Sequence, residues 1–178
     1  MKLFVTSLLS AVLVLSAAAS FAAGPVPAAP APKAKPDLVK GQASFATCSG
    51  CHGADGNSGT PANPKLAQQH PEYIVKQLQE YKSGKRANAI MSGIAAGLTE
   101  EDMKNIAFWV TTNKAKPGNA TDKELVALGE RIYRGGIKER QITACAGCHS
   151  PNGAGIPAQY PRLSGQHAEY TAAQLTYF

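Results

Sequence analysis

The sequence predicts an all-α protein built from two similar helical units in tandem. The first observation is an internal repeat with a step of 97 residues, which carries the Cys-x-x-Cys-His motif at 48–52 onto the one at 145–149. The second is apolar spacing typical of helices, and the third is the absence of alternating strand patterns. The repeat continues without a gap through Gly56/Gly153, Pro64/Pro161, Leu66/Leu163, Gln69/Gln166, His70/His167, Glu72/Glu169, Tyr73/Tyr170, Gln77/Gln174 and Leu78/Leu175. Two copies indicate paired domains rather than a solenoid.

Residues 36–47 (PDLVKGQASFAT) and 123–134 (KELVALGERIYR) have apolar spacings that predict a helix just before each cysteine pair. Residues 70–84 predict a further helix, with Pro71 in the first turn, where proline is tolerated. Its apolar side follows helical spacing and carries Ile74 and Leu78, beside a stripe of Tyr73, Gln77 and Tyr81.

Residues 98–113 (LTEEDMKNIAFWVTTN) predict the last helix of the first unit, with Thr99 as its N-cap. Asp102, three residues later, is the expected partner in a capping box. The broad apolar side of this helix carries Ile106, Phe108, Trp109 and Val110. The Gly- and Pro-rich stretches after each Cys-x-x-Cys-His motif are expected to be loops.

The N-terminus has the layout of a cleaved secretory signal. Lys2 precedes an apolar run, and small residues follow at Ser20 and Ala22, so we expect a signal peptide at 1–22. A retained membrane anchor is the alternative, although the apolar run is short for a span. No later stretch is apolar enough to cross a bilayer, which predicts an exported soluble protein, located in the periplasm of a Gram-negative source.

Two Pro-containing stretches divide the rest of the chain. Residues 23–36 alternate Pro with Ala and Lys, which predicts an extended tether. Residues 113–123 have a similar composition and predict a linker. The first unit is therefore expected at 37–112 and the second unit at 124–178. Units this small bury little apolar surface and need an additional stabilising group, such as disulfides, a metal or a cofactor.

The formal net charge of +6 becomes +5 once Lys2 is removed with the signal. The basic residues are scattered along the chain rather than clustered, so the sequence gives little support to nucleic-acid binding. An acidic partner or a membrane surface remains compatible with this excess.

All four cysteines lie in the two Cys-x-x-Cys-His motifs. A disulfide oxidoreductase uses Cys-x-x-Cys in a βαβ setting that this sequence lacks, and it needs no adjacent His. A zinc site needs its cysteine pairs closer together or additional ligands nearby. Covalent haem attachment uses both thiols and the His, and the motif occurs twice in duplicated helical units. The sequence therefore predicts two haem c groups, with His52 and His149 as proximal ligands.

Each haem iron needs a sixth ligand. In the first unit, Met91 lies in a Gly- and Ala-rich stretch that we expect to be a loop between two helices. Met103 and His70 are the alternatives, the first on a helix where Met more often fills a core and the second before a helix-starting Pro. Met91 is preferred because a loop lets its thioether reach the haem.

The second unit has no equivalent of Met91 in this sequence. The matching position is 188, and no Met follows His149. Either the sequence is a fragment, which we expect because it stops inside an amphipathic helix, or another residue such as His167 serves the second haem.

These motifs together resemble the dihaem cytochrome c4 family. The likeness spans nearly the whole chain after the signal. It rests on CSGCHGADG, NPKLAQQHPEYIVKQLQEYKSGKR, Met91 and LTEEDMKNIAFWV in the first unit, and on LGERIYRGGI, ACAGCHSPNGAG and YPRLSGQHAEYTAAQL in the second. The resemblance implies two class I cytochrome c domains related by pseudo-twofold symmetry, with the haems facing each other across the interface. It also implies a periplasmic carrier, free or attached to the membrane face, that passes electrons toward terminal oxidases.

Carried over residue by residue, the resemblance assigns roles to nine positions. Thioether attachment is implied at Cys48, Cys51, Cys145 and Cys148, proximal ligation at His52 and His149, and distal ligation at Met91. Pro64 and Pro161 match the family proline whose carbonyl receives the proximal His N–H. The family's second Met has no counterpart in this sequence, so the resemblance assigns no sixth ligand to the second haem.

Several other side chains have two interpretations. Tyr73 and Tyr170 could bond near a propionate or the domain interface, but packing a helix against the haem edge is the simpler expectation. Arg86 and Arg162 could pair with propionates, but solvated surface charges are the commoner case. Trp109 is expected in the core behind the haem.

The sequence therefore predicts a soluble dihaem electron carrier without substrate turnover, since six-coordinate iron moves electrons rather than binding substrates. Its expected partners are a respiratory electron donor and a terminal oxidase, met through brief and partly electrostatic contacts. The alternative is a dihaem enzyme with an open iron position, such as a peroxidase or a thiosulfate-oxidising cytochrome. A fixed subunit of an oxidase complex is a third possibility.

Overall fold

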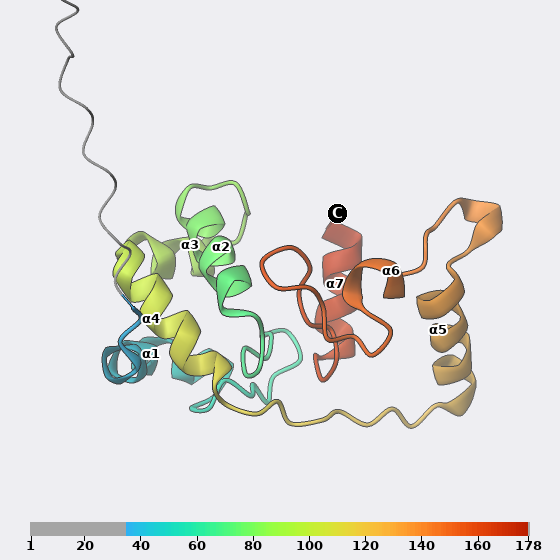
Figure 1. Ribbon diagram of the computed structural model, residues 1–178, viewed down its shortest axis with the longest axis horizontal. Coiled ribbons are helices and arrows are strands. Elements are labelled where there is room, and N and C mark those ends of the chain that lie inside the picture. The colour runs from blue at the N-terminus through green and yellow to red at the C-terminus, as the bar shows by residue number, and fades with distance from the viewer. Residues whose placement is uncertain (1–34, 178) are drawn as a thin grey trace, which may run out of the picture. The chain divides into compact units, whose positions relative to one another are not determined.

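The computed structural model describes residues 35–177, and the regular structure there is helical (Figure 1). The helices are α1 (Leu38–His52), α2 (Pro71–Lys82), α3 (Ala89–Ala96), α4 (Glu100–Thr111), α5 (Lys123–Gly135), the 3-10 helix η1 (Lys138–Arg140), α6 (Ala146–His149) and α7 (Ala168–Tyr177). Paired extended backbone within 35–177 is limited to two isolated bridges, Ile137–Ile142 and Ile156–Tyr160. The prediction of an all-α fold is confirmed. The predicted signal peptide and nearly all of the predicted tether lie outside the described residues.

The hydrophobic core of the first unit is built from residues of α1, α2 and α4. α1 and α2 both pack against α4, and α3 packs against α2 (Figure 1). The core consists of Phe45, Ile74, Leu78, Met103, Ile106, Ala107 and Val110. The predicted apolar side of α2 is therefore buried, while Trp109 is half-buried and stacks at an angle on Phe45, with ring centroids 4.9 Å apart. None of the described helices has the length and apolar character needed to span a bilayer.

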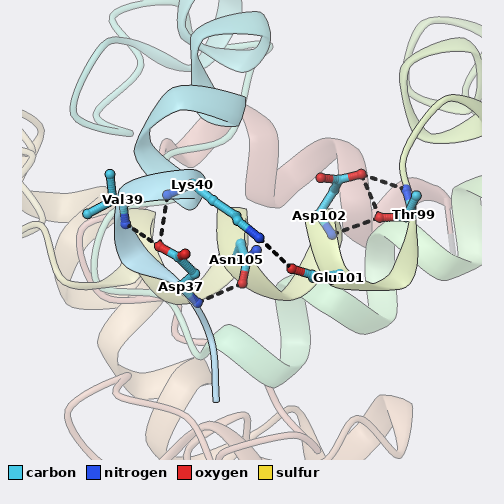
Figure 2. A network of polar contacts seen from close by, with 7 residues as sticks. All are labelled: Asp37, Val39, Lys40, Thr99, Glu101, Asp102 and Asn105. Carbon is cyan, nitrogen blue, oxygen red and sulfur yellow. Dashed lines mark hydrogen bonds and ion pairs between the residues drawn. The ribbon is translucent and has the colours of Figure 1, made fainter. Parts of the chain in front are cut away.

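α1 crosses α4 at a point where the first helix has no side chain. A Cβ atom on Gly41 would lie 2.1 Å from the backbone oxygen of Asn105, well inside van der Waals contact. The start of α1 is fixed at the same place, because Asp37 donates its backbone N–H to Asn105 Oδ1 at 2.8 Å. The Asp37 carboxylate also caps α1 by accepting from the N–H groups of Val39 and Lys40, both at 3.0 Å (Figure 2).

α4 begins with the predicted capping box (Figure 2). Asp102 donates its backbone N–H to Thr99 Oγ1 at 3.1 Å, and its carboxylate accepts from the Thr99 N–H at 3.0 Å. The Thr99 hydroxyl also donates to the Asp102 carboxylate at 2.6 Å, and this bond, together with the one from the Thr99 N–H, lowers the pKa of Asp102. The Lys40–Glu101 ion pair next to the box is 3.2 Å long and lies on the surface.

The first helix of the second unit forms where the sequence predicted it, but it does not lead directly into the cysteine pair. α1 runs without a break through its Cys-x-x-Cys-His motif, but α5 stops at Gly135, and residues 136–144 intervene before Cys145. Gly136 turns the chain with a φ of +72°, and a Cβ there would lie 2.2 Å from the Ile142 oxygen. The predicted helix at 123–134 is therefore confirmed, but its expected position directly before the cysteines is wrong, because the Gly-Gly pair ends the helix.

The segment that joins the two units is extended between α4 and α5 (Figure 1), and its first half is bonded to the first unit. Lys116 donates its backbone N–H to Asn57 Oδ1 at 2.7 Å and accepts from Lys65 Nζ at 2.8 Å. Its ammonium pairs with Asp55 at 2.8 Å. Asn57 also donates to the Lys114 oxygen at 3.0 Å. The connection is thus anchored as far as residue 116.

Candidate functional site

The first motif lies at the C-terminal end of α1, where i,i+3 spacing puts both cysteines on one side of the helix. His52 is only 7% exposed, and its Nδ1 donates to the Pro64 oxygen at 2.8 Å. Because a carbonyl oxygen only accepts, this bond assigns the proton to Nδ1 and leaves Nε2 with a free lone pair in the neutral ring. An imidazole held in this way presents one fixed nitrogen to a metal ion.

Burial sets the ionisation state of this motif. Desolvation lowers the pKa of His52, and the Pro64 bond opposes that effect only in part, so the ring is neutral near pH 7. Burial also raises the pKa of the Cys48 thiol to about 11. Cys51 is exposed, and neither sulfur is in a disulfide. A pair of free cysteines beside an imidazole with a free Nε2 has the groups that haem c attachment requires, in which each S–H adds across one vinyl double bond.

The second motif repeats this arrangement on a different local scaffold. His149 ends the short helix α6, and its Nδ1 donates to the Pro161 oxygen at 2.9 Å. Cys145 is half-buried and Cys148 is exposed, as in the first motif. Tyr133 of α5 donates its hydroxyl to the Ser150 oxygen at 2.6 Å, which connects the interrupted helix to the motif.

Met91 is the third residue of α3, so the expectation that it lies in a loop is wrong. Asn88 caps the helix by accepting from the Met91 N–H at 2.9 Å, and the run AIMSGIAA is a good helix former. Met91 is half-buried and packs against the core of the first unit. Met103, the alternative thioether, has an exposed fraction of 0% within that core.

The two histidines that the sequence offered as alternative iron ligands bond to backbone in the opposite unit. His70 donates from Nε2 to the Ala154 oxygen, and His167 donates from Nε2 to the Ser58 oxygen, both at 2.9 Å. The two histidines are equivalent in the repeat, and their acceptors differ by one position in it, so this exchange of contacts is approximately what a pseudo-twofold relation requires.

Two repeated glutamines, to which the sequence analysis gave no role, pair with the backbone across the same interface. Gln69 accepts from the Arg162 N–H at 2.7 Å and donates to the Arg162 oxygen at 3.0 Å. Gln166 accepts from the Lys65 N–H and donates to the Lys65 oxygen, both at 2.9 Å. Their exact repetition was the signal that could have found them.

Arg86 also crosses between the units, which corrects the expectation of a solvated charge. Its guanidinium is half-buried and donates to Gln77 Oε1 at 2.5 Å, to the Tyr170 hydroxyl at 3.0 Å and to Gln174 Oε1. It also lies 4.8 Å above the centre of the Tyr81 ring. The Arg86 guanidinium therefore joins Gln77 of α2 to Tyr170 and Gln174 of α7.

The profile of the family described as cytochrome c matches residues 38–114 and 126–178, which contain one motif each. Cytochrome c4 of Pseudomonas aeruginosa is 48% identical over 143 residues, which cover 80% of this chain and 71% of that protein. The chain belongs to the cytochrome c4 family. A crystal structure of reduced cytochrome c4 from Pseudomonas stutzeri superposes with a TM-score of 0.75 at 42% identity, covering 80% of each chain. The thiosulfate dehydrogenase electron acceptor of Stutzerimonas stutzeri is 40% identical over 131 residues, or 72% of this chain and 61% of that protein.

Family membership identifies the protein as a dihaem electron carrier with two covalently bound haem c groups. It also implies redox proteins as partners and favours a periplasmic location. His52, which is buried, and His149, which is half-buried, each lie beside a free cysteine pair and are the residues of this chain that fit such a cofactor.

Proposed function

We propose that the protein carries electrons in the periplasm toward a terminal oxidase, using one haem in each unit. Cys48, Cys51, Cys145 and Cys148 form the thioether bonds, and His52 and His149 are the proximal ligands. The observation that carries this assignment is the repeated Nδ1 bond from His to a proline carbonyl, because it orients both rings and leaves Nε2 free. Pro64 and Pro161 act as the outer partners.

Met91 is the distal ligand of the first haem in this proposal. Its half-buried position against the core supports the assignment, since Met103 is occupied in packing and the Nε2 atom of His70 is occupied in a hydrogen bond. Bound haem supplies one reversible electron per iron. The chain's own residues orient the imidazole, exclude water from it and, with a thioether, close the sixth position, which favours electron transfer over substrate binding.

The domain organisation belongs to the same proposal. The first unit covers 37–112, the linker 113–123 and the second unit 124–178, after a cleaved signal at 1–22 and a tether at 23–36. In this proposal the tether allows the carrier to associate peripherally with the membrane. Its electron donor is a respiratory redox protein, and nucleic acid is not a partner, because the basic residues are scattered.

One comparison favours a second candidate function, in which the protein accepts electrons from a thiosulfate dehydrogenase. The likeness to a thiosulfate dehydrogenase electron acceptor supports a carrier that accepts electrons from thiosulfate oxidation. Reduced holoprotein mixed with oxidase-containing membranes should be reoxidised rapidly if the respiratory role holds. Rapid reduction of the oxidised protein by a thiosulfate dehydrogenase with thiosulfate, without reoxidation by the membranes, would favour the second role.

Met91→Ala tests the ligand assignment directly. We expect the reduced variant to bind one more carbon monoxide per molecule than the wild type, because an open sixth position accepts the gas. Met103→Leu is the matched control and should leave the stoichiometry unchanged. A gain of carbon monoxide binding in Met103→Leu alone, or a wild-type mass that lacks two haems, would overturn the assignment.

A further inference from the structure

The two peptide groups beside the proximal histidines are each bonded at both ends. In the peptide between Pro64 and Lys65, the oxygen accepts from His52 Nδ1 at 2.8 Å and the N–H donates to Gln166 Oε1 at 2.9 Å. One planar peptide therefore connects a histidine of the first unit to a glutamine of the second.

The same arrangement occurs in the opposite direction. In the peptide between Pro161 and Arg162, the oxygen accepts from His149 Nδ1 at 2.9 Å and the N–H donates to Gln69 Oε1 at 2.7 Å. Each glutamine thus acts on the histidine of the other repeat. Neither glutamine bonds to the proline peptide of its own unit.

Both glutamine side chains are held in one orientation. The carboxamide of each donates back to the same residue from which it accepts, so the pairing resembles one rung of a β-ladder. Each Oε1 also accepts from the N–H of the next residue, His70 or His167, at 3.0 Å. Gln69 is only 9% exposed. Water therefore competes little with the bonds of Gln69, whereas Gln166 is half-buried.

We propose that Gln69 and Gln166 are crossed positioning residues, each of which lowers the reduction potential of the haem in the opposite unit. The proposal rests on the proposed function, because it needs His52 and His149 as iron ligands. It assigns to the domain interface a chemical role in tuning the irons, in addition to holding the units together.

The sign follows from hydrogen-bond cooperativity. A peptide that donates its N–H to an acceptor is polarised, and its oxygen becomes a stronger acceptor. The Nδ1–H bond of the histidine is then stronger, so the ring gains basicity and donates more charge through Nε2. Greater donation stabilises the oxidised iron. Loss of the glutamine acceptor should therefore raise the potential of the haem in the other unit.

The test uses holoprotein variants Gln166→Leu and Gln69→Leu, which keep the approximate side-chain volume. The potential of each haem is measured by redox titration with resolved haem NMR signals. Gln166→Leu should raise the potential of the first haem and Gln69→Leu that of the second, while the haem of the variant's own unit changes little. Gln166→Glu keeps an acceptor for the Lys65 N–H and should not raise the first potential.

His167→Leu is the matched control, because it removes the bond to Ser58 at the same interface without touching either proline peptide. It should leave the first potential near the wild-type value. A second readout is solvent exchange of the histidine Nδ1 protons, which should accelerate for His52 in Gln166→Leu and not for His149.

Three results would overturn the crossed tuning: a shift in the variant's own unit, equal shifts in both units, or no shift in either. An equal effect of His167→Leu would also overturn it, by showing that a loosened interface is the cause. Failure of the proposed function is distinguishable, since wild-type protein would then lack two haems or histidine ligation in its spectrum.

Discussion

Gly41 shows how one absent side chain determines a helix crossing. The backbone oxygen of Asn105 in α4 occupies the place where a Cβ would stand, and the Trp109 Cβ lies 2.9 Å from the same point. Neither obstacle is the flexible end of a side chain. Any larger residue must therefore separate α1 from α4, and α1 carries the first motif at its other end.

Gly41→Ala is expected to lower the free energy of unfolding of the holoprotein by about 1–3 kcal/mol, the usual cost of overpacking. The measurement is equilibrium denaturation by guanidinium chloride. Gly93→Ala is the control, because a Cβ in that exposed position of α3 meets nothing within 4 Å. It should gain about 0.5–1 kcal/mol from the higher helix propensity of Ala. Equal effects at both positions would contradict the close contact.

Asp55 predicts a pH dependence at the anchored connection. Its hydrogen bonds from Lys116 and from the Asn57 N–H lower its pKa from 3.8 to about 2. Because the folded-state pKa lies below the unfolded one, the stabilisation is complete above pH 3.8 and is lost as the pH falls toward 2. The effect is small, since both side chains are largely exposed.

Comparison of the wild type with Asp55→Asn by denaturation at several pH values tests this. The difference in stability should be constant near neutral pH and should shrink below pH 3.8. A difference that persists unchanged at the lowest pH would show that the carboxylate charge is not the source.

At the scale of the element, the start of α4 depends on a local signal. Thr99 and Asp102 each satisfy a backbone N–H of the other, so the first turn needs no tertiary partner. Thr99→Ala should cost about 1 kcal/mol of unfolding free energy, because the N–H of Asp102 loses its acceptor. Thr112→Ala, at the other end of the helix, removes only a hydroxyl bond to the Trp109 oxygen and should be nearly neutral. Similar losses in both variants would argue against the cap.

Elements with such local signals were predicted well from the sequence. Pro71 and the capping box mark the starts of α2 and α4, and the buried residues of α2 follow its apolar spacing. The position of Met91 was misjudged because a run rich in Gly and Ala indicates a loop by composition, whereas the Asn88 cap nucleates a helix. The separation of α5 from the second motif was missed, although its bounds were predicted, because the repeat aligns well only after the cysteines.

The candidate site was predictable where the chain itself brings the residues together. Cys-x-x-Cys-His is contiguous, so its meaning does not depend on the rest of the fold. The contacts by which Gln69, Gln166 and Arg86 reach the opposite unit join residues more than 80 positions apart, and no local pattern encodes them. The repeat singled out the two glutamines, but only the structure identifies the atoms they bond.

At the scale of the whole molecule, contacts with the first unit hold much of the segment 161–177 in place. α5, α6 and α7 have no buried residue within the described chain, whereas the first unit has a continuous core. The double variant Gln69→Leu/Gln166→Leu of the holoprotein should therefore raise hydrogen–deuterium exchange mainly across 161–177, with α1 and α4 still protected. Uniformly faster exchange in both units would contradict this dependence.

The anchored joint has a kinetic consequence. Because the backbone is fastened to the first unit as far as Lys116, only residues 117–121 are free before Asp122 caps α5. At 3.3–3.6 Å per residue, this linker spans no more than about 20 Å between Lys116 and Asp122. If the first and second units separate, the linker keeps the second unit at a high effective concentration near the first. The two units therefore bind again before they can diffuse apart. Any separation of the two units is then brief, and a longer linker should prolong it.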